Sequence, residues 1–254
     1  MGEPTGHAEL ATGARDVLRR NGFRPLVVCD DGARGVPGRS PYDRLISTAS
    51  VGVSGLPAAW LDQVSTGGVL LAPWGGDYHP GGLVRLTKAA DGSASGPVVG
   101  GVSFMRLRAQ RAQFGHAGRL SGLIDAAVDA REGTTPGTTT EVATNVEAAF
   151  AAGLRLRGVQ KSIARTGQDE REILLYDPDS DSAATVRTSA KFTVGGEHPV
   201  RQIGRRSLWT DAVAAHRWWN QLGRPDRTRF GLTVRPDGRH VLRIDGEVVA
   251  LRGR

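Results

Sequence analysis

An acidic pair followed by glycine, at the end of an apolar run, is the part of this sequence best suited to binding chemistry. The apolar residues 26–28 lead into Asp30-Asp31-Gly32. A carboxylate at such a strand end can accept a hydrogen bond from an exocyclic amine, for example the N6 amine of adenine. Gly32 carries no side chain, so a planar ring can approach the backbone there. A turn that binds no ligand is the alternative, because Asp-Gly is a common turn pair.

Three small residues, Thr48, Ala49 and Ser50, end a second apolar run. In an open parallel sheet, ligands bind beyond the carboxyl ends of the strands, near the point where the strand order reverses. We therefore expect Asp31 and Thr48 to face one cavity. Ordinary packing at a strand end is the alternative explanation for each of the three residues.

The elements that would position these residues alternate between strand and helix. The periodicity predicts a helix over 7–21 and a helical turn over 57–63, where Pro57 occupies a tolerated first position. Short apolar runs predict strands, which lie at Leu26–Cys29, Asp43–Ala49, Val69–Ala72, Leu83–Thr87 and Val98–Met105. This order indicates an α/β sheet with an antiparallel edge over residues 1–111.

A change in composition follows Arg111. Residues 112–141 are rich in Gly, Ala, Thr and Ser, which predicts a flexible linker or loop. Residues 142–254 predict a smaller α+β carboxyl-terminal domain. Its expected elements are a helix from Val142, a hairpin over 172–188, a helix over 207–222 and a hairpin over 230–244.

Three segments in register carry a family resemblance: Asp30-Asp31-Gly32, Pro41-Tyr42-Asp43 and the run from Gly67 to Pro73. They resemble the second half of a class I, S-adenosylmethionine-dependent methyltransferase, and most closely the protein-L-isoaspartate O-methyltransferases. The resemblance covers about residues 3–105. It implies a partial Rossmann-like sheet, with S-adenosyl-L-methionine as the cofactor.

The resemblance also implies roles for single residues. Asp30-Asp31-Gly32 stands where the family has Gly-Asp-Gly, so Asp31, Gly32 and Ala33 are expected at the adenine end of the cofactor. Thr48, Ala49 and Ser50 are expected to bind the substrate carboxylate. No catalytic base is assigned, because an ionised carboxylate is already a nucleophile and the enzyme mainly orients the reactants and excludes water.

The first half of the fold, which holds most of the cofactor site in this family, has no counterpart before His7. Glu3 is the one candidate for the family's ribose-binding acid. The absent strands would lie between Leu26–Cys29 and Asp43–Ala49, which leaves apolar strand edges unpaired. A late start codon or truncation, a degenerate protein, and complementation by another chain are the three explanations considered.

The implied partner is a protein or peptide that carries aspartate or isoaspartate. Residues 208–234 resemble a carboxyl-terminal extension of actinobacterial homologues, some of which act on aspartate during ribosomal-peptide maturation. A non-catalytic peptide-binding module, with Trp218 as an exposed contact, is the alternative function.

Composition and charge limit the kinds of protein that this chain can be. The net charge is +7, but arginine is dispersed along the chain, so a generally basic surface is preferred to nucleic-acid binding. Cys29 is the single cysteine, which excludes an internal disulfide and a cysteine metal cluster. The six histidines show no metal-binding spacing, so no metal is expected. The chain shows neither a secretory signal nor an apolar stretch long enough to cross a membrane, and we expect a cytoplasmic protein.

Overall fold

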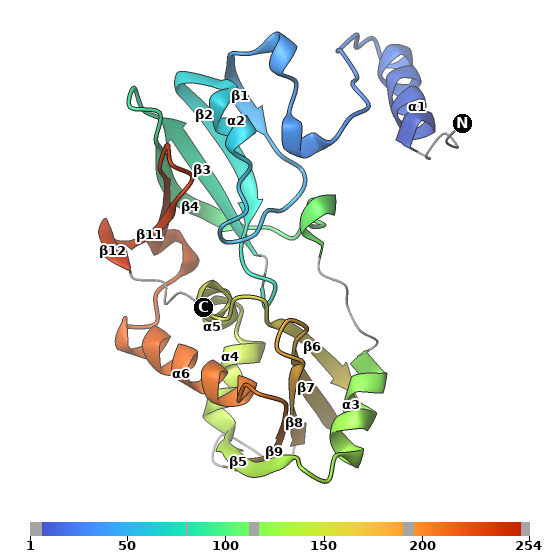
Figure 1. Ribbon diagram of the computed structural model, residues 1–254, viewed down its shortest axis with the longest axis vertical. Helices are drawn as coiled ribbons and strands as arrows, with labels where there is room; N and C mark the ends of the chain where they lie inside the picture. The colour runs from blue at the N-terminus through green and yellow to red at the C-terminus, as the bar shows by residue number, and fades with distance from the viewer. Residues whose placement is uncertain (1–6, 80, 112–116, 190–195, 250–254) are drawn as a thin grey trace.

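Two β-sheets form the framework of the computed structural model, which describes residues 7–79, 81–111, 117–189 and 196–249 (Figure 1). The first sheet has the strand order β1-β2-β3-β4-β10-β11-β12 and the second has the order β5-β9-β8-β7-β6. The strands of the first sheet are β1 (Tyr42–Ile46), β2 (Val64–Trp74), β3 (Gly82–Lys88), β4 (Ala94–Gly101), β10 (Phe230–Val234), β11 (His240–Ile244) and β12 (Glu247–Val249). Those of the second are β5 (Arg131–Pro136), β6 (Gln160–Arg165), β7 (Glu170–Asp177), β8 (Ser182–Ser189) and β9 (Glu197–Ile203).

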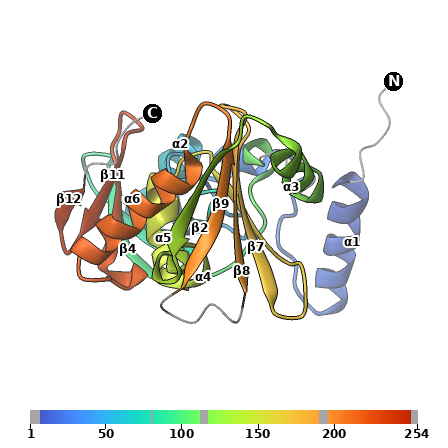
Figure 2. The same cartoon turned by 90° about the horizontal axis from the view of Figure 1, so that it is seen from below.

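Helices cover both sheets. The α-helices are α1 (His7–Arg20), α2 (Ala58–Asp62), α3 (Ala117–Ala126), α4 (Glu141–Thr144), α5 (Val146–Arg155) and α6 (Leu208–Gln221). Short 3-10 turns are η1 (Gly32–Arg34), η2 (Pro37–Arg39), η3 (Arg108–Gln110), η4 (Gly137–Thr140) and η5 (Arg227–Arg229). Helix α3 packs on one face of the second sheet, and α6 packs on the other (Figure 2).

The α/β class with an antiparallel edge is confirmed. β1 and β2 pair in parallel, and α2 lies on the crossover between them, whereas β2, β3 and β4 pair antiparallel. β2 is longer than predicted because it begins at Val64 and continues through an irregularity at Gly67, whose φ of 79° favours glycine. The helices predicted over 7–21 and 207–222 and both predicted hairpins are also present.

The strand predicted at Leu26–Cys29 is wrong, because this segment has no regular structure. Leu26 is 62% exposed and Val28 is 46% exposed. Apolar composition alone does not make a strand, since its N–H and C=O groups need partners in a ladder. β1 ends the order of the first sheet, and its outer side pairs with no strand of the described residues.

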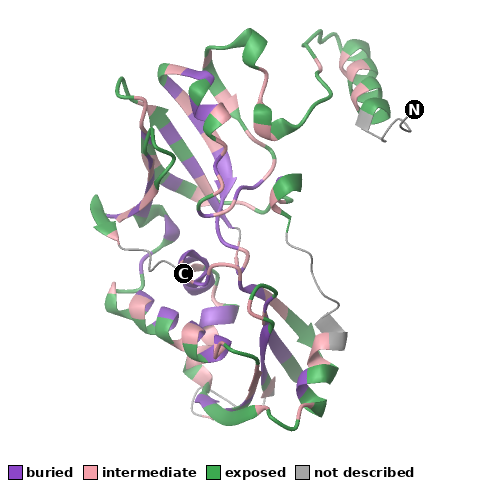
Figure 3. Cartoon of the chain, in the orientation of Figure 1, coloured by how far each residue is buried: buried purple, intermediate pink, exposed green. Residues whose placement is uncertain are grey.

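An apolar surface remains open on this side of the molecule. Ile46 on β1 is 69% exposed, and the apolar side chains of α1 are also solvent-facing, with Leu10 71% exposed. Helix α1 stands away from both sheets and is largely exposed along its length (Figure 3). Of the two strand edges expected to be unpaired, the β1 edge has no partner strand among the described residues, whereas residues 26–29 form no strand and so present no such edge.

Residues 112–141 were predicted to be a flexible linker or loop, and the structure differs from that prediction. The described part of this segment contains α3 and β5, and β5 pairs with β9 in the second sheet. Residues 142–254 do not form a separate unit either, because β10 pairs with β4 and extends the first sheet. Local sequence gives the β7–β8 and β10–β11 hairpins correctly but misses β5, and it carries no information on which sheet a distant strand joins.

Helix α5 lies between the two sheets and belongs to both cores. Phe150, Ala151 and Leu154 pack with the first sheet, whereas Ala149 and Ala152 pack with the second. Residues 148–154 of this helix are all buried, and Figure 3 shows most of the helix in the colour of buried residues. A helix that is apolar on all sides is expected in the centre of a larger protein.

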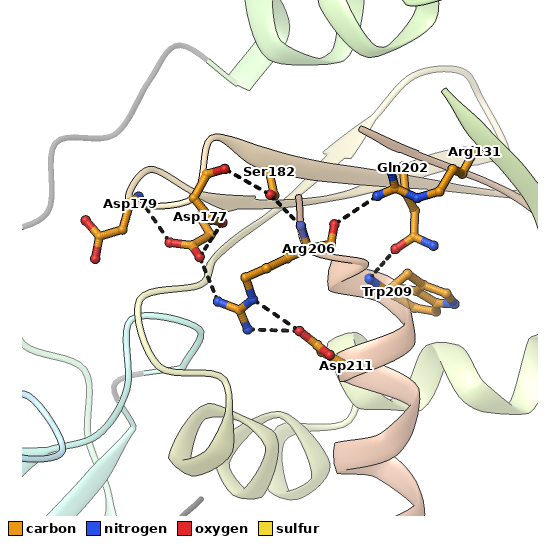
Figure 4. A network of polar contacts seen from close by, with 9 residues as sticks. Arg131, Asp177, Asp179, Ser182, Gln202, Arg206, Trp209 and Asp211 are labelled. Carbon is orange, nitrogen blue, oxygen red and sulfur yellow. Dashed lines mark hydrogen bonds and ion pairs between the residues drawn. The ribbon is translucent and has the colours of Figure 1, made fainter. Parts of the chain in front are cut away.

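Arg206 connects the second sheet to α6 (Figure 4). Its guanidinium donates to Asp177 Oδ2 at 2.7 Å and to Asp211 Oδ2 at 2.9 Å. Its backbone N–H donates to Ser182 Oγ, and its carbonyl accepts from Arg131. These contacts fix the β7–β8 turn against the first turn of α6.

Within the described ranges, no helix combines the length and apolar character needed to cross a membrane.

Candidate functional site

A cavity of about 450 Å³ lies at the carboxyl end of β1, beside α2. This volume is within the range of small-molecule sites, roughly 300–1,000 Å³. Its walls come from the segment before η1, the end of β1, α2 and the segment after β4. The lining residues are Val28, Asp30, Asp31, Gly32, Gly35, Val36, Tyr42, Arg44, Leu45, Ile46, Ser47, Thr48, Ala49, Trp60, Gln63 and Leu107.

The residues Asp31–Val36, named here the Asp31 loop, form one wall. Asp31 is exposed, and its Oδ1 accepts a hydrogen bond from the Ala33 N–H at 3.0 Å, which caps η1. No described residue donates to its second oxygen, Oδ2. The carboxylate therefore keeps an acceptor for a ligand amine while its other oxygen holds the local turn.

The opposite wall is the turn that follows β1. Ser47 Oγ donates to the Ala49 carbonyl at 2.7 Å, so this turn is held by its own side chain. Thr48 is exposed and Ala49 is half-buried at the cavity. Their small side chains leave space between this turn and the Asp31 loop.

The structure brings together four of the predicted residues, since Asp31, Gly32, Thr48 and Ala49 all line the one cavity. Ala33 lies beside it and packs against the core of the first sheet. Ser50 is 1% exposed and does not line the cavity; its backbone pairs with residues 105–107 instead. Glu3 lies outside the described residues.

Sequence reasoning missed two contributors, Trp60 and Gln63. The pattern of residues 57–63 indicated a helical turn, and its members were interpreted only as structural. The sequence offered only a tryptophan in a short helix and a glutamine directly after it, and it gave no sign of the loop that they contact. Both side chains contact the Asp31 loop.

Trp218, the candidate for an exposed peptide contact, is already packed. The Arg155 guanidinium lies 4.9 Å from the centre of its ring, and the Phe230 ring lies 6.3 Å away. The side chain is partly buried against the core of the first sheet. These contacts favour a packing role at this position.

His79 belongs to a second cluster of charged groups, at the junction of the two sheets. Burial, followed by the charges of Lys161 and Arg227, lowers its pKa to about 4. Burial also lowers the pKa of Lys161 to about 8, and its Nζ donates to the Ala143 carbonyl at 2.6 Å. No group of at least three described His, Cys, Asp or Glu residues is arranged to hold a metal.

Acidification is expected to destabilise the protein through His79. Its folded pKa of about 4 lies below the unfolded value of about 6.5, so the unfolded chain takes up the proton first as the pH falls through this interval. Because the side chain is partly solvated, we expect a loss of about 1 kcal/mol in unfolding free energy between pH ~6.5 and ~4.5. Urea unfolding of the wild type and His79→Gln at both pH values measures it. Parallel pH profiles for the two proteins would contradict this assignment.

Comparison with known proteins finds matches to the amino-terminal part of the chain. A family model described as protein-L-isoaspartate(D-aspartate) O-methyltransferase matches residues 6–112. Residues 6–112 are therefore similar to this methyltransferase family. A protein-L-isoaspartate O-methyltransferase of Xanthomonas euvesicatoria pv. vesicatoria is 35% identical over 117 residues, which is 46% of this chain and 45% of the relative. One of Pyrococcus horikoshii is 36% identical over 100 residues, 39% of this chain and 44% of the relative.

The match to protein-L-isoaspartate O-methyltransferases covers only part of this chain and only part of each relative. The chain spans less than half the length of the curated relatives it matches, and the family match ends at residue 112. A solved structure of a protein-L-isoaspartate O-methyltransferase aligns with 93% of this chain and 65% of its own, at 16% identity and a TM-score of 0.41. The cavity is lined entirely by residues of the matched segment.

Proposed function

We propose that this chain supplies the purine-binding and acceptor-facing walls of an S-adenosyl-L-methionine-dependent carboxyl O-methyltransferase of the protein-L-isoaspartate type. The observation that carries the proposal is that Asp31 and Thr48, from separate segments of the family match, line one cavity. The substrate class is a protein or peptide with an aspartate or isoaspartate carboxylate.

The residues of the cavity fit one end of such a cofactor. Asp31 Oδ2 is available to accept from the adenine amine, and the indole of Trp60 and the side chain of Leu107 supply apolar surface. When bound, S-adenosyl-L-methionine supplies an electrophilic methyl group. Thr48 and Ala49 leave room for a substrate carboxylate, which needs orientation and exclusion of water rather than a base.

The cavity is open on the side of the unpaired β1 edge. Arg44, Leu45 and Ile46 line it from that edge, and Ile46 is 69% exposed. Water enters freely there, which weakens hydrogen bonds to a ligand. We infer that residues 1–254 by themselves bind the cofactor weakly, and that a polypeptide covering this edge is required for methyl transfer.

Weak but specific binding is the expected result of a titration with S-adenosylmethionine. Ligand-observed NMR should give a dissociation constant of about 1 mM, and Asp31→Ala should weaken binding about tenfold because a hydrogen bond to a charged acceptor is lost. Asp62→Ala is the matched control, since Asp62 is an exposed residue of α2 outside the cavity.

Equal binding by wild type, Asp31→Ala and Asp62→Ala would reject the role of Asp31. A dissociation constant in the low micromolar range would show that the open edge does not limit binding. Methyl transfer to an isoaspartyl peptide by residues 1–254 alone would contradict the need for a covering polypeptide.

A further inference from the structure

We propose that Gln63 and Trp60 are positioning residues, which hold the Asp31 loop in the shape that the cavity requires. This inference rests on the proposed function, because the loop carries the carboxylate assigned to the purine. The residues preceding the loop do not hold it, since 26–29 are not in a strand and are largely exposed. The loop must therefore be fixed from elsewhere.

Gln63 fixes the loop through both ends of its side-chain amide. Its Nε2 donates to the Arg34 carbonyl at 2.7 Å, and its Oε1 accepts from the Val36 N–H at 2.8 Å. The amide thus pairs with the backbone on either side of Gly35, as a peptide group of a neighbouring strand would. Gln63 is 5% exposed, so water does not compete for these bonds.

The glycine at position 35 of the loop leaves the space that the Gln63 amide occupies. Gly35 has a φ of 61°, and a Cβ built at this position would lie 2.4 Å from Gln63 Oε1. A side chain there would push the amide away. An ionised carboxylate at position 63 would accept from Val36 but would repel the Arg34 carbonyl, so only an amide satisfies both partners.

Trp60 and Tyr42 hold the two ends of the loop. Trp60 Nε1 donates to the Gly32 carbonyl at 2.8 Å, directly after Asp31, and Trp60 is 4% exposed. Tyr42 Oη donates to the Val36 carbonyl at 2.8 Å. Helix α2 and the first residue of β1 thus place the Asp31 carboxylate at the cavity.

Amide hydrogen exchange of the full chain tests the role of Gln63. In Gln63→Glu, exchange of the Val36 N–H should be about tenfold faster than in the wild type at pH ~7.5, where the new carboxylate is ionised. At pH ~5 the buried carboxyl should be substantially protonated and able to donate to Arg34, so the ratio should return to within about twofold. A general loss of structure would not be reversed by acid.

Gln110→Glu is the matched control, because Gln110 makes the same kind of contact outside the cavity. It accepts from the Gly52 N–H at 2.9 Å and donates to the Gly55 carbonyl at 2.5 Å. This substitution should speed exchange at Gly52 and leave Val36 unchanged. Trp60→Phe, which keeps an aromatic ring but removes the donor to Gly32, is the second loop variant.

Binding of adenosine, followed by ligand-observed NMR, separates the two proposals. Gln63→Glu should weaken binding about fivefold at pH ~7.5 and regain it at pH ~5, and Trp60→Phe should weaken it at both. If the wild type fails to bind adenosine while Val36 responds as expected, the proposed function fails and the positioning of the loop stands. Unchanged Val36 exchange in Gln63→Glu, or a defect that acid does not relieve, would overturn the inference.

Discussion

Replacing Phe150 by alanine should lower the free energy of unfolding by about 4 kcal/mol, the largest effect expected for a substitution in this chain. Phe150 is fully buried on α5, and its ring makes edge contacts with Trp74 at 6.2 Å and Phe230 at 5.7 Å. These partners lie on strands from opposite ends of the sequence. Truncation would leave a cavity where they meet the helix.

Urea unfolding followed by circular dichroism measures this loss. Phe104→Ala is the control, because Phe104 is 42% exposed and its truncation should change stability by less than about 0.5 kcal/mol. Hydrogen exchange of Phe150→Ala should show faster opening in both sheets, since α5 packs on each of them. Loss of protection in one sheet alone would show that the two unfold independently.

Replacing Glu147 by alanine should cost about 3 kcal/mol, because it leaves the buried Arg227 guanidinium without its counter-charge. Arg227 donates to Glu147 through Nε at 3.0 Å and Nη2 at 2.7 Å, and its side chain is 7% exposed. Its backbone N–H also donates to Glu147 Oε2 at 2.8 Å. One carboxylate thus connects η5, the turn that precedes β10, to the first turn of α5.

Glu132→Ala provides the comparison, because Glu132 pairs with Arg201 at 2.6 Å but its side chain is 67% exposed. Its removal should cost less than about 1 kcal/mol, and that cost should shrink in high salt, whereas the effect of Glu147→Ala should persist. Similar, salt-sensitive losses for the two variants would contradict a buried role for the Arg227–Glu147 pair.

Both large effects fall where residues 142–254 meet the first sheet. β10 is hydrogen-bonded to β4, and Trp219 of α6 packs in the core of that sheet. A fragment that begins at residue 142 would therefore expose part of this core. The carboxyl-terminal region is structurally part of the body that carries the candidate site.

The proposed site could be predicted in part because its signals are local. Asp31-Gly32 and Thr48-Ala49 end segments whose composition and order resemble a known family, and the structure brings all four to one cavity. Ser50 could not be separated from them by sequence, since its burial depends on pairing with residues 105–107. The contribution of Gln63 was equally hidden, because its partners are 27 and 29 residues away.

The sequence by itself determined α1, α2, α6 and the two predicted hairpins, the parallel-to-antiparallel order of β1 to β4, and the resemblance of the amino-terminal part to a methyltransferase family. Those features follow from periodicity, turn residues and short motifs, which act over a few positions. Only the tertiary structure decided that Leu26–Cys29 forms no strand, that β10 to β12 complete the first sheet, and that α2 holds the Asp31 loop. Each of these depends on whether a distant backbone group is present to accept or donate a hydrogen bond, and local sequence does not encode that.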